Sequence, residues 1–193
     1  DGIRGRVNTP PMTAESALRL AIAAARTFAP EGGREVVIGR DTRRSGEMIE
    51  AALIAGLTSM GLQPVLLGIV PTPNVALMTR ATGAALGLMI SASHNKADDN
   101  GLKLFSPEGI KLTDETEEAL EAAMAVAFEG AYAVPAAITT PQRLGNATAL
   151  YLDRCLDTVG ADMDLSGLKI VLDCAHGAAF EVGPAALRQL DAD

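Results

Sequence analysis

The sequence predicts an α/β fold in which a mixed, largely parallel sheet is layered with helices, followed by the beginning of a second, similar α/β domain. Short segments rich in valine, isoleucine and leucine alternate with longer segments whose apolar residues recur every three or four positions. The first pattern indicates strands, the second indicates amphipathic helices, and their alternation is typical of parallel sheets. Hydrophobic residues make up 48% of the chain and aromatic residues only 3%, so the core must be aliphatic.

The expected elements of the first domain follow one another along residues 1–128. In chain order they are a helix from Thr13 to Phe28, a strand at Glu35–Gly39, a helix over Met48–Leu57, a strand at Pro64–Gly68, a short helix at Val75–Thr79, strands at Ala84–Ile90 and Gly101–Phe105, and a helix from Thr113 to Phe128. Thr13 and Thr113 suit helix N-caps, because a hydroxyl there accepts a backbone N–H that the first turn leaves free. Since parallel strands end at one edge of a sheet, we expect the loops after Ile38, Leu67 and Ile90 to meet there.

Three regions divide the chain: a first domain at residues 1–135, a linker at 136–146 and the start of a second α/β domain at 147–193. The linker lacks a periodic pattern and contains Pro141. The second region is expected to hold a helix at Ala147–Val159, a strand at Lys169–Asp173 and a helix opened by Pro184. Because the sequence starts at Asp1 without methionine and stops at Asp193 after an apparent helix, we expect that both ends are truncated.

Composition argues against several classes of protein. A formal net charge of −8 disfavours a nucleic-acid partner, because binding to a phosphate backbone needs clustered lysine and arginine. We also expect no membrane partner, since no run of 18 or more apolar residues occurs. The chain has only two cysteines, Cys155 and Cys174, which is simplest to reconcile with a reducing cytoplasm. The sequence gives no information on oligomeric state.

The most informative stretch is Ser91–Asn95, with the sequence S-A-S-H-N, directly after the strand expected to end at Ile90. A serine is a poor nucleophile unless its proton is removed or its product is stabilised. A Ser-His-Asp hydrolase is disfavoured, because Ser93 lies between Ala92 and His94 and no G-x-S-x-G elbow is present. A serine that carries a phosphoryl group, with roughly 1.5 to 2 negative charges, fits the cations nearby. The alternative is a polar turn that ends a strand.

Other polar segments suit anions. Residues 39–46, G-R-D-T-R-R-S-G, join a strand to a helix, and the fork of Arg40 or Arg43 and the helix N-terminus would both suit a phosphate. The alternative is an Asp-Arg network that only fixes the loop. Near the N-terminus, two glycines flank Arg4, although a solvated terminus would look the same. In the strand beyond the serine segment, side-chain alternation could turn Lys103 toward Ser93.

The order of these motifs resembles the α-D-phosphohexomutase family throughout the chain. The motifs are D-G-I-R-G at 1–5, G-R-D-T-R-R-S at 39–45, P-T-P at 71–73, S-A-S-H-N at 91–95, D-N-G-L-K at 99–103 and D-C-A at 173–175. The likeness is strongest to bacterial members that act on glucosamine phosphates. It implies the reversible conversion of glucosamine 6-phosphate to glucosamine 1-phosphate through an enzyme phosphoserine and a bisphosphorylated sugar.

The resemblance also implies roles for particular residues. Ser93 would carry the phosphoryl group, and one of its phosphoryl oxygens would be a ligand of a single Mg²⁺ ion. His94 and Lys103 would exchange protons with a hydroxyl of the phosphorylated hexosamine substrate, with Arg4 positioning charge. The family is further expected to use a sugar 1,6-bisphosphate as intermediate and activator. The remaining expected phosphate- and substrate-binding residues are Arg40, Arg43, Ser91 and Asn95.

Two departures from the family pattern stand out. Lys96 replaces the usual proline of the serine loop, and His176 stands where asparagine is usual. The family's three-aspartate metal loop, sugar-selecting loop and late phosphate-binding loop would lie beyond Asp193, so we expect this segment to be inactive alone. The alternatives are a phosphomannomutase or phosphoglucomutase, and a sugar-phosphate-binding module without catalysis.

Overall fold

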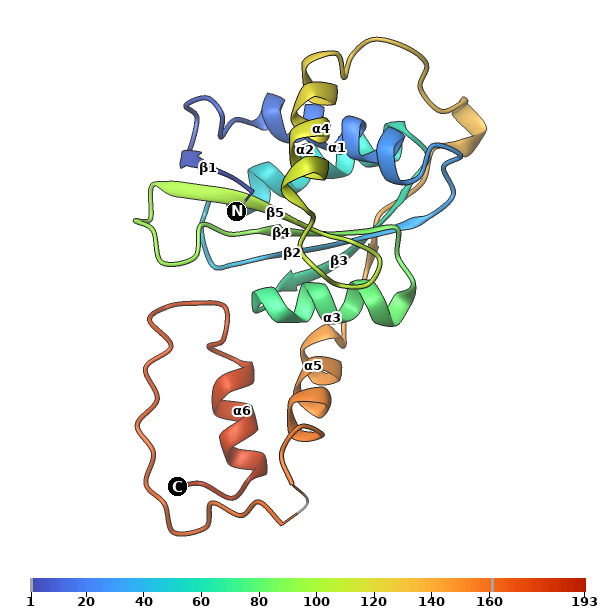
Figure 1. Ribbon diagram of the computed structural model, residues 1–193. Coiled ribbons are helices and arrows are strands. Elements are labelled where there is room, and N and C mark those ends of the chain that lie inside the picture. The colour runs from blue at the N-terminus through green and yellow to red at the C-terminus, as the bar shows by residue number, and fades with distance from the viewer. Residues whose placement is uncertain (1, 161) are drawn as a thin grey trace.

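A mixed six-stranded sheet organises the first part of the computed structural model, which describes residues 2–160 and 162–193 (Figure 1). In these ranges the strands are β1 (Ile3–Arg6), β2 (Glu35–Arg40), β3 (Gln63–Ile69), β4 (Leu86–Ile90), β5 (Asp99–Phe105) and β6 (Gln142–Arg143). Their order across the sheet is β1-β5-β4-β2-β3-β6. Strands β4, β2, β3 and β6 run parallel, whereas β5 is antiparallel to both of its neighbours. The predicted mixed, largely parallel α/β sheet is therefore confirmed.

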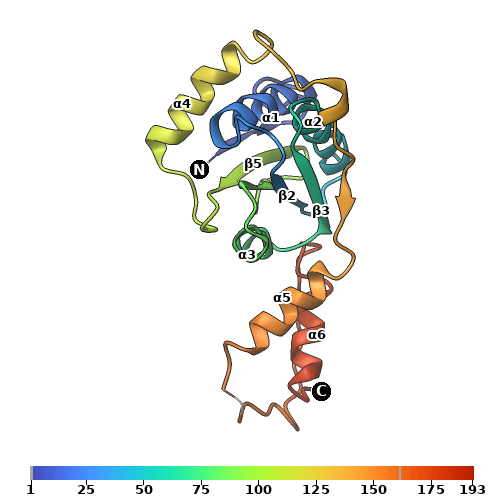
Figure 2. The same ribbon diagram turned by 90° about the vertical axis from the view of Figure 1, so that its right-hand side faces the viewer.

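Helices cover both faces of this sheet. They are α1 (Ala14–Phe28), α2 (Gly46–Ser59), α3 (Thr72–Thr82) and α4 (Asp114–Ala125), followed in the later part of the chain by the short 3₁₀ helix η1 (Pro135–Ala137), α5 (Ala147–Leu156) and α6 (Val182–Gln189). Helices α1, α2 and α4 lie over one face and α3 over the other (Figures 1 and 2). No helix in the described ranges is both long and apolar enough to cross a membrane.

The helix starts follow from local chemistry. The Thr13 hydroxyl accepts the N–H of Ser16 at 3.1 Å, and the Thr113 hydroxyl accepts the N–H of Thr116 at 3.3 Å. Both predicted N-caps are therefore confirmed. Helix α3 begins at Thr72, three residues before the predicted start, with proline in its first turn, where a missing N–H costs no helical hydrogen bond.

Three segments differ from the sequence-based expectations. Residues 3–6, expected to be an anion loop or a solvated terminus, form edge strand β1, while Asp1 of the same motif lies outside the described residues. Part of the 136–146 segment predicted as a linker is strand β6, which pairs with β3. The predicted strand at Lys169–Asp173 is wrong. Asp193 bonds to Leu168 and Ile170 through its backbone, but no strand of the described chain runs beside these residues, and a strand needs a neighbouring strand along its length.

The register of the parallel strands brings their carboxyl ends level. Arg40 at the end of β2 lies opposite both Ile69 of β3 and Ile90 of β4. The loops that follow these three strands therefore meet at one edge of the sheet, as predicted. On one face, Gly39 lets α3 approach β2, because a Cβ at this position would lie 2.5 Å from Val75 Cγ2.

We predict that Gly39→Ala destabilises the fold by about 1–3 kcal/mol, because the added methyl overpacks the contact between α3 and the sheet. Urea unfolding would measure the loss. Gly145→Ala is the matched control, since a Cβ there would meet no atom within 4 Å. Equal unfolding midpoints for the two variants would contradict this account of the packing.

Candidate active site

A cleft of about 960 Å³ opens at the carboxyl edge of the sheet. It is lined mainly by three segments: the arginine loop, residues 41–45 between β2 and α2; the serine loop, residues 91–99 after β4; and residues 175–179 of the later part of the chain. Pro71 and Thr72, after β3, and Met89 of β4 complete the lining. A hydrogen bond of 2.6 Å from the Thr42 hydroxyl to the His176 carbonyl joins the first segment to the third. The cleft thus combines loops that are far apart in the sequence.

The two serines of the S-A-S-H-N motif have different environments. Ser91 is buried, donates its hydroxyl to Asp41 Oδ2 at 2.7 Å and accepts the backbone N–H of Ser93 at 3.0 Å. Ser93 is exposed in the cleft and has a φ of 58°, a left-handed conformation that is uncommon for residues other than glycine. Ser91 therefore supports the loop from below, which differs from the phosphate-binding role expected of it, and Ser93 presents the free hydroxyl.

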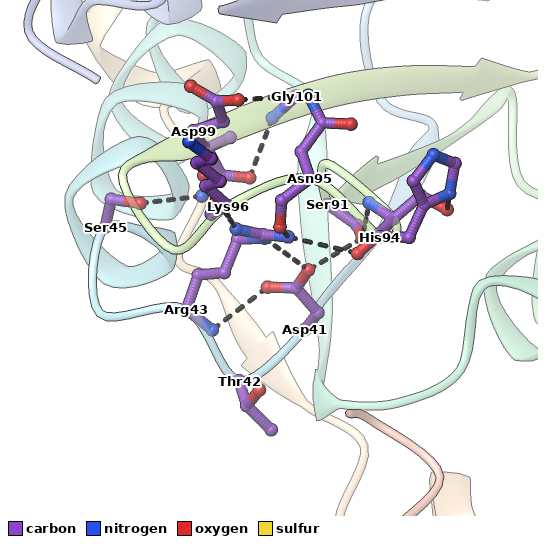
Figure 3. A network of polar contacts seen from close by, with 12 residues as sticks. Asp41, Thr42, Arg43, Ser45, Ser91, His94, Asn95, Lys96, Asp99 and Gly101 are labelled. Carbon is purple, nitrogen blue, oxygen red and sulfur yellow. Dashed lines mark hydrogen bonds and ion pairs between the residues drawn. The ribbon is translucent and has the colours of Figure 1, made fainter. Parts of the chain in front are cut away.

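Arg43 is the centre of the polar network around the serine loop (Figure 3). Its Nε donates to Asp41 Oδ2 at 3.0 Å. Its other N–H groups donate to backbone carbonyls, from Nη1 to Lys96 at 2.5 Å and Asp99 at 3.1 Å, and from Nη2 to Ser93 at 3.0 Å and Asn95 at 2.9 Å. A guanidinium has five N–H donors, so this network uses all of them. Arg43 has none left for a phosphate, contrary to the sequence-based expectation.

Side-chain amides make a second tether of the same loop. Asn95 donates through Nδ2 to Asp99 Oδ2 at 3.0 Å, which ties the two ends of the turn together. Asn100 donates through Nδ2 to Ser45 Oγ at 2.8 Å, so the start of β5 is bound to the arginine loop. In this arrangement Asn95 supports the loop, and its expected contact with substrate remains a proposal.

His94 is the basic side chain next to the Ser93 hydroxyl. Its Nδ1 lies 3.4 Å from Ser93 Oγ, longer than a well-formed hydrogen bond. Within the described ranges no carboxylate is bonded to the imidazole, so no Ser-His-Asp triad is formed.

Lys103 and Arg4 lie on one face of the sheet beside the cleft. Lys103 is opposite Met89, which lines the cleft, and Arg4 is opposite Gly101, two residues from Lys103. Directly opposed residues share a face, as do residues two apart. Burial lowers the pKa of the Lys103 ammonium, and repulsion from Arg4 and Lys111 adds to the effect. Neither cation lines the cleft itself in the described chain, so their expected catalytic roles remain proposals.

Arg40 points to helix α2 instead of the cleft. It pairs with Glu47 at 3.1 Å and with the buried Glu50 at 3.6 Å. Burial raises the pKa of the Glu50 carboxyl, and Arg40 opposes this shift. Arg40 therefore stabilises the end of β2 against α2, and the structure does not place it where it was expected to bind phosphate.

Arg44, which was not among the residues expected to bind phosphate, is the exposed guanidinium of the arginine loop. It lines the cleft and has no ion pair among the described residues. Three arginines in five residues carry no sequence signal that tells them apart, because their roles depend on which way each side chain leaves the loop.

The described residues do not form a cation site by themselves. They contain no cluster of three histidine, cysteine, aspartate or glutamate side chains that could hold a metal ion. Asp41 in the cleft is already bonded to Arg43 and Ser91.

The fold and the site define an α/β/α domain with an exposed serine on a fixed loop. A family model described as phosphoglucomutase/phosphomannomutase, alpha/beta/alpha domain I, matches residues 1–130. The phosphoglucosamine mutase of Hyphomonas neptunium is 73% identical over 192 residues, and that of Caulobacter vibrioides is 51% identical over 195 residues. Each match covers 100% of this chain, and it covers 43% of the first relative and 44% of the second.

A solved structure supports the same fold. The phosphoglucomutase/phosphomannomutase family protein from Burkholderia thailandensis superposes with a TM-score of 0.81 at 24% identity, over 100% of this chain and 41% of that one. The chain therefore belongs to the phosphoglucomutase/phosphomannomutase family, and it spans less than half the length of the curated relatives it matches.

We predict that Arg4→Gln raises the pKa of Lys103 toward its ordinary value of 10.5, because one of the cations that repel the charged ammonium is removed. NMR titration of ¹³C-dimethylated lysines would measure the shift. Arg6→Gln is the control, since Arg6 is exposed and pairs with Asp98. An unchanged Lys103 pKa in Arg4→Gln would contradict the proposed repulsion between Arg4 and Lys103. So would a wild-type Lys103 pKa as high as the raised pKa of Lys111.

Proposed function

We propose that this chain carries the phosphoryl-transfer serine of a phosphoglucosamine mutase, which interconverts glucosamine 6-phosphate and glucosamine 1-phosphate. The observation that carries the proposal is the exposed Ser93 hydroxyl, presented in a cleft by a loop whose backbone is bound from behind. The choice of sugar follows relatives named phosphoglucosamine mutase at 73% and 51% identity. The product would supply amino-sugar nucleotide and cell-wall precursor synthesis.

The proposed reaction is two phosphoryl transfers. In the first, phosphorylated Ser93 transfers its phosphoryl group to the free hydroxyl of the sugar phosphate: the P–Oγ bond breaks, a P–O bond to the sugar forms, the sugar hydroxyl gives up its proton, and Ser93 Oγ takes one up. This yields a sugar 1,6-bisphosphate, which reorients in the cleft. In the second, the P–O bond to the other sugar oxygen breaks, a P–Oγ bond to Ser93 forms as its hydroxyl gives up a proton, and the sugar oxygen that is left takes one up. The net result is isomerisation, with the phosphoserine regenerated.

Side chains of this chain supply the proton carriers in the proposal. His94 is beside the reacting hydroxyl, with its Nδ1 3.4 Å from Ser93 Oγ. Lys103 has a lowered pKa, which makes its neutral, proton-accepting form more accessible. Arg4 contributes positive charge beside Lys103. Arg44, exposed in the cleft, is the arginine that is free to bind a phosphate of the substrate.

A magnesium ion is part of the proposed cofactor set. When bound, it would neutralise charge on the transferring phosphoryl group. Phosphorylated Ser93 would give it one oxygen ligand. The reaction would take place in the cytoplasm, which fits the unbridged state of Cys155 and Cys174.

We predict that Ser93→Ala abolishes mutase activity of a full-length protein that contains this chain, because the phosphoryl carrier is lost. Intact-mass measurement should find one phosphoryl group on the wild type and none on the variant. Assays on glucosamine, mannose and glucose phosphates should show a preference for glucosamine. Ser166→Ala, a change at an exposed serine outside the cleft, should leave activity unchanged. Full activity of Ser93→Ala, or a wild type that never carries phosphate, would contradict the proposal.

A further inference from the structure

Both backbone polar groups of Ser93 are bound inside the protein. Its N–H donates to Ser91 Oγ at 3.0 Å, and its carbonyl accepts from Arg43 Nη2 at 3.0 Å. Asp41 joins these contacts, because one of its oxygens, Oδ2, accepts from both Ser91 Oγ and Arg43 Nε. The left-handed backbone at Ser93 is therefore held on both sides, since such a conformation persists only where its surroundings fix it.

The same clamp determines where the other peptide groups of the loop point. In a trans peptide the carbonyl and the following N–H point in opposite directions. The carbonyls of Ser93, Asn95 and Lys96 all converge on the Arg43 guanidinium. The N–H groups in the same three peptide units belong to the next residues along the chain, His94, Lys96 and Ala97, and must point away from the guanidinium.

These outward N–H groups are unpaired. No backbone or side-chain acceptor among the described residues binds the N–H of His94, Lys96 or Ala97, whereas those of Asn95 and Asp99 are bound within the loop. His94 and Ala97 line the cleft into which Ser93 projects. Unpaired backbone N–H groups clustered in a loop are ready donors for a phosphate oxygen.

We propose that Arg43 is a positioning residue for phosphoryl transfer. By drawing four carbonyls to one guanidinium, it fixes Ser93 and turns the N–H groups of His94 and Ala97 outward as donors to the phosphoryl group that Ser93 carries. Arg43 itself does not touch the substrate. The inference rests on the proposed phosphoryl transfer at Ser93, and it adds a role for the loop backbone and its clamp.

Lysine at position 43 separates geometry from charge. It keeps one positive charge, but its three donors on a flexible stem cannot replace a planar five-donor fork. In a full-length protein, Arg43→Lys and Arg43→Gln should each lower kcat about 100-fold, as expected for reacting groups displaced by about 1 Å, with KM changed less than about threefold. Arg154→Gln is the matched control, because it removes an exposed arginine on α5 that pairs with Asp157. It should leave kcat and KM unchanged.

Kinetic outcomes of other kinds would overturn the proposal. Wild-type kcat in Arg43→Lys would show that charge alone is needed, and a raised KM with an unchanged kcat would show that Arg43 binds substrate. Thermal unfolding of each variant identifies a global loss of fold. If Arg43→Gln fails to fold, Arg43→Lys carries the test.

Amide NMR tests the loop directly. Phosphorylation of the wild type by glucose 1,6-bisphosphate should shift the His94 and Ala97 amide protons downfield, and in Arg43→Lys this shift should be lost. Unshifted amides in the phosphorylated wild type would overturn the proposed donors.

Hydrogen exchange at Ser93 and Asn95 should be at least about tenfold faster in Arg43→Lys, with strand β2 unaffected. A wild type without mutase activity would contradict only the proposed function, because hydrogen exchange in the serine loop still decides whether Arg43 holds that loop. Unchanged exchange at Ser93 and Asn95 in Arg43→Lys would overturn the inference about Arg43.

Discussion

One guanidinium holds the serine loop in place. Arg43 follows β2, yet its donors reach carbonyls that span the whole turn between β4 and β5. The cost of burying a charged group is met here by a carboxylate on Nε and a carbonyl on every other N–H. Hydrogen bonds to charged groups are also stronger than neutral ones. The conformation of Ser93 is thus specified by a residue 50 positions earlier in the chain.

The sheet makes this contact possible. Its parallel register sets the ends of β2 and β4 side by side, so the arginine loop and the serine loop emerge from neighbouring strands. Asn100, at the start of β5, then donates a hydrogen bond to Ser45 in the arginine loop. A rigid aliphatic core beneath the loops, with Ile38, Leu88 and Ile90 fully buried, gives them a fixed base. Strand pairing therefore brings the arginine loop and the serine loop together, and the polar contacts between them fix their conformations.

Sequence patterns predicted much of this architecture, because strand and helix periodicity and N-cap chemistry are local. They failed where the outcome depended on distant partners. Arg40, Arg43 and Arg44 are chemically identical in the sequence, but one pairs with α2, one clamps the serine loop and one faces the cleft. Similarly, the apolar run at residues 169–173 has the composition of a strand and lacks a neighbouring strand in the described chain. The selection of Ser93 depended on motif order, since a turn serine and a phosphoryl carrier look alike in isolation.

The position of Ser93 depends on an Arg43 guanidinium that is bound at all five N–H groups. Side-chain NMR of ¹⁵N-arginine-labelled protein tests it most directly, because bound N–H protons exchange slowly with water and bonded guanidinium groups rotate slowly. Arg43 should give four separate Nη proton signals that are protected from exchange, while exposed Arg44 gives averaged signals. A single averaged, rapidly exchanging Nη signal for Arg43 would contradict it.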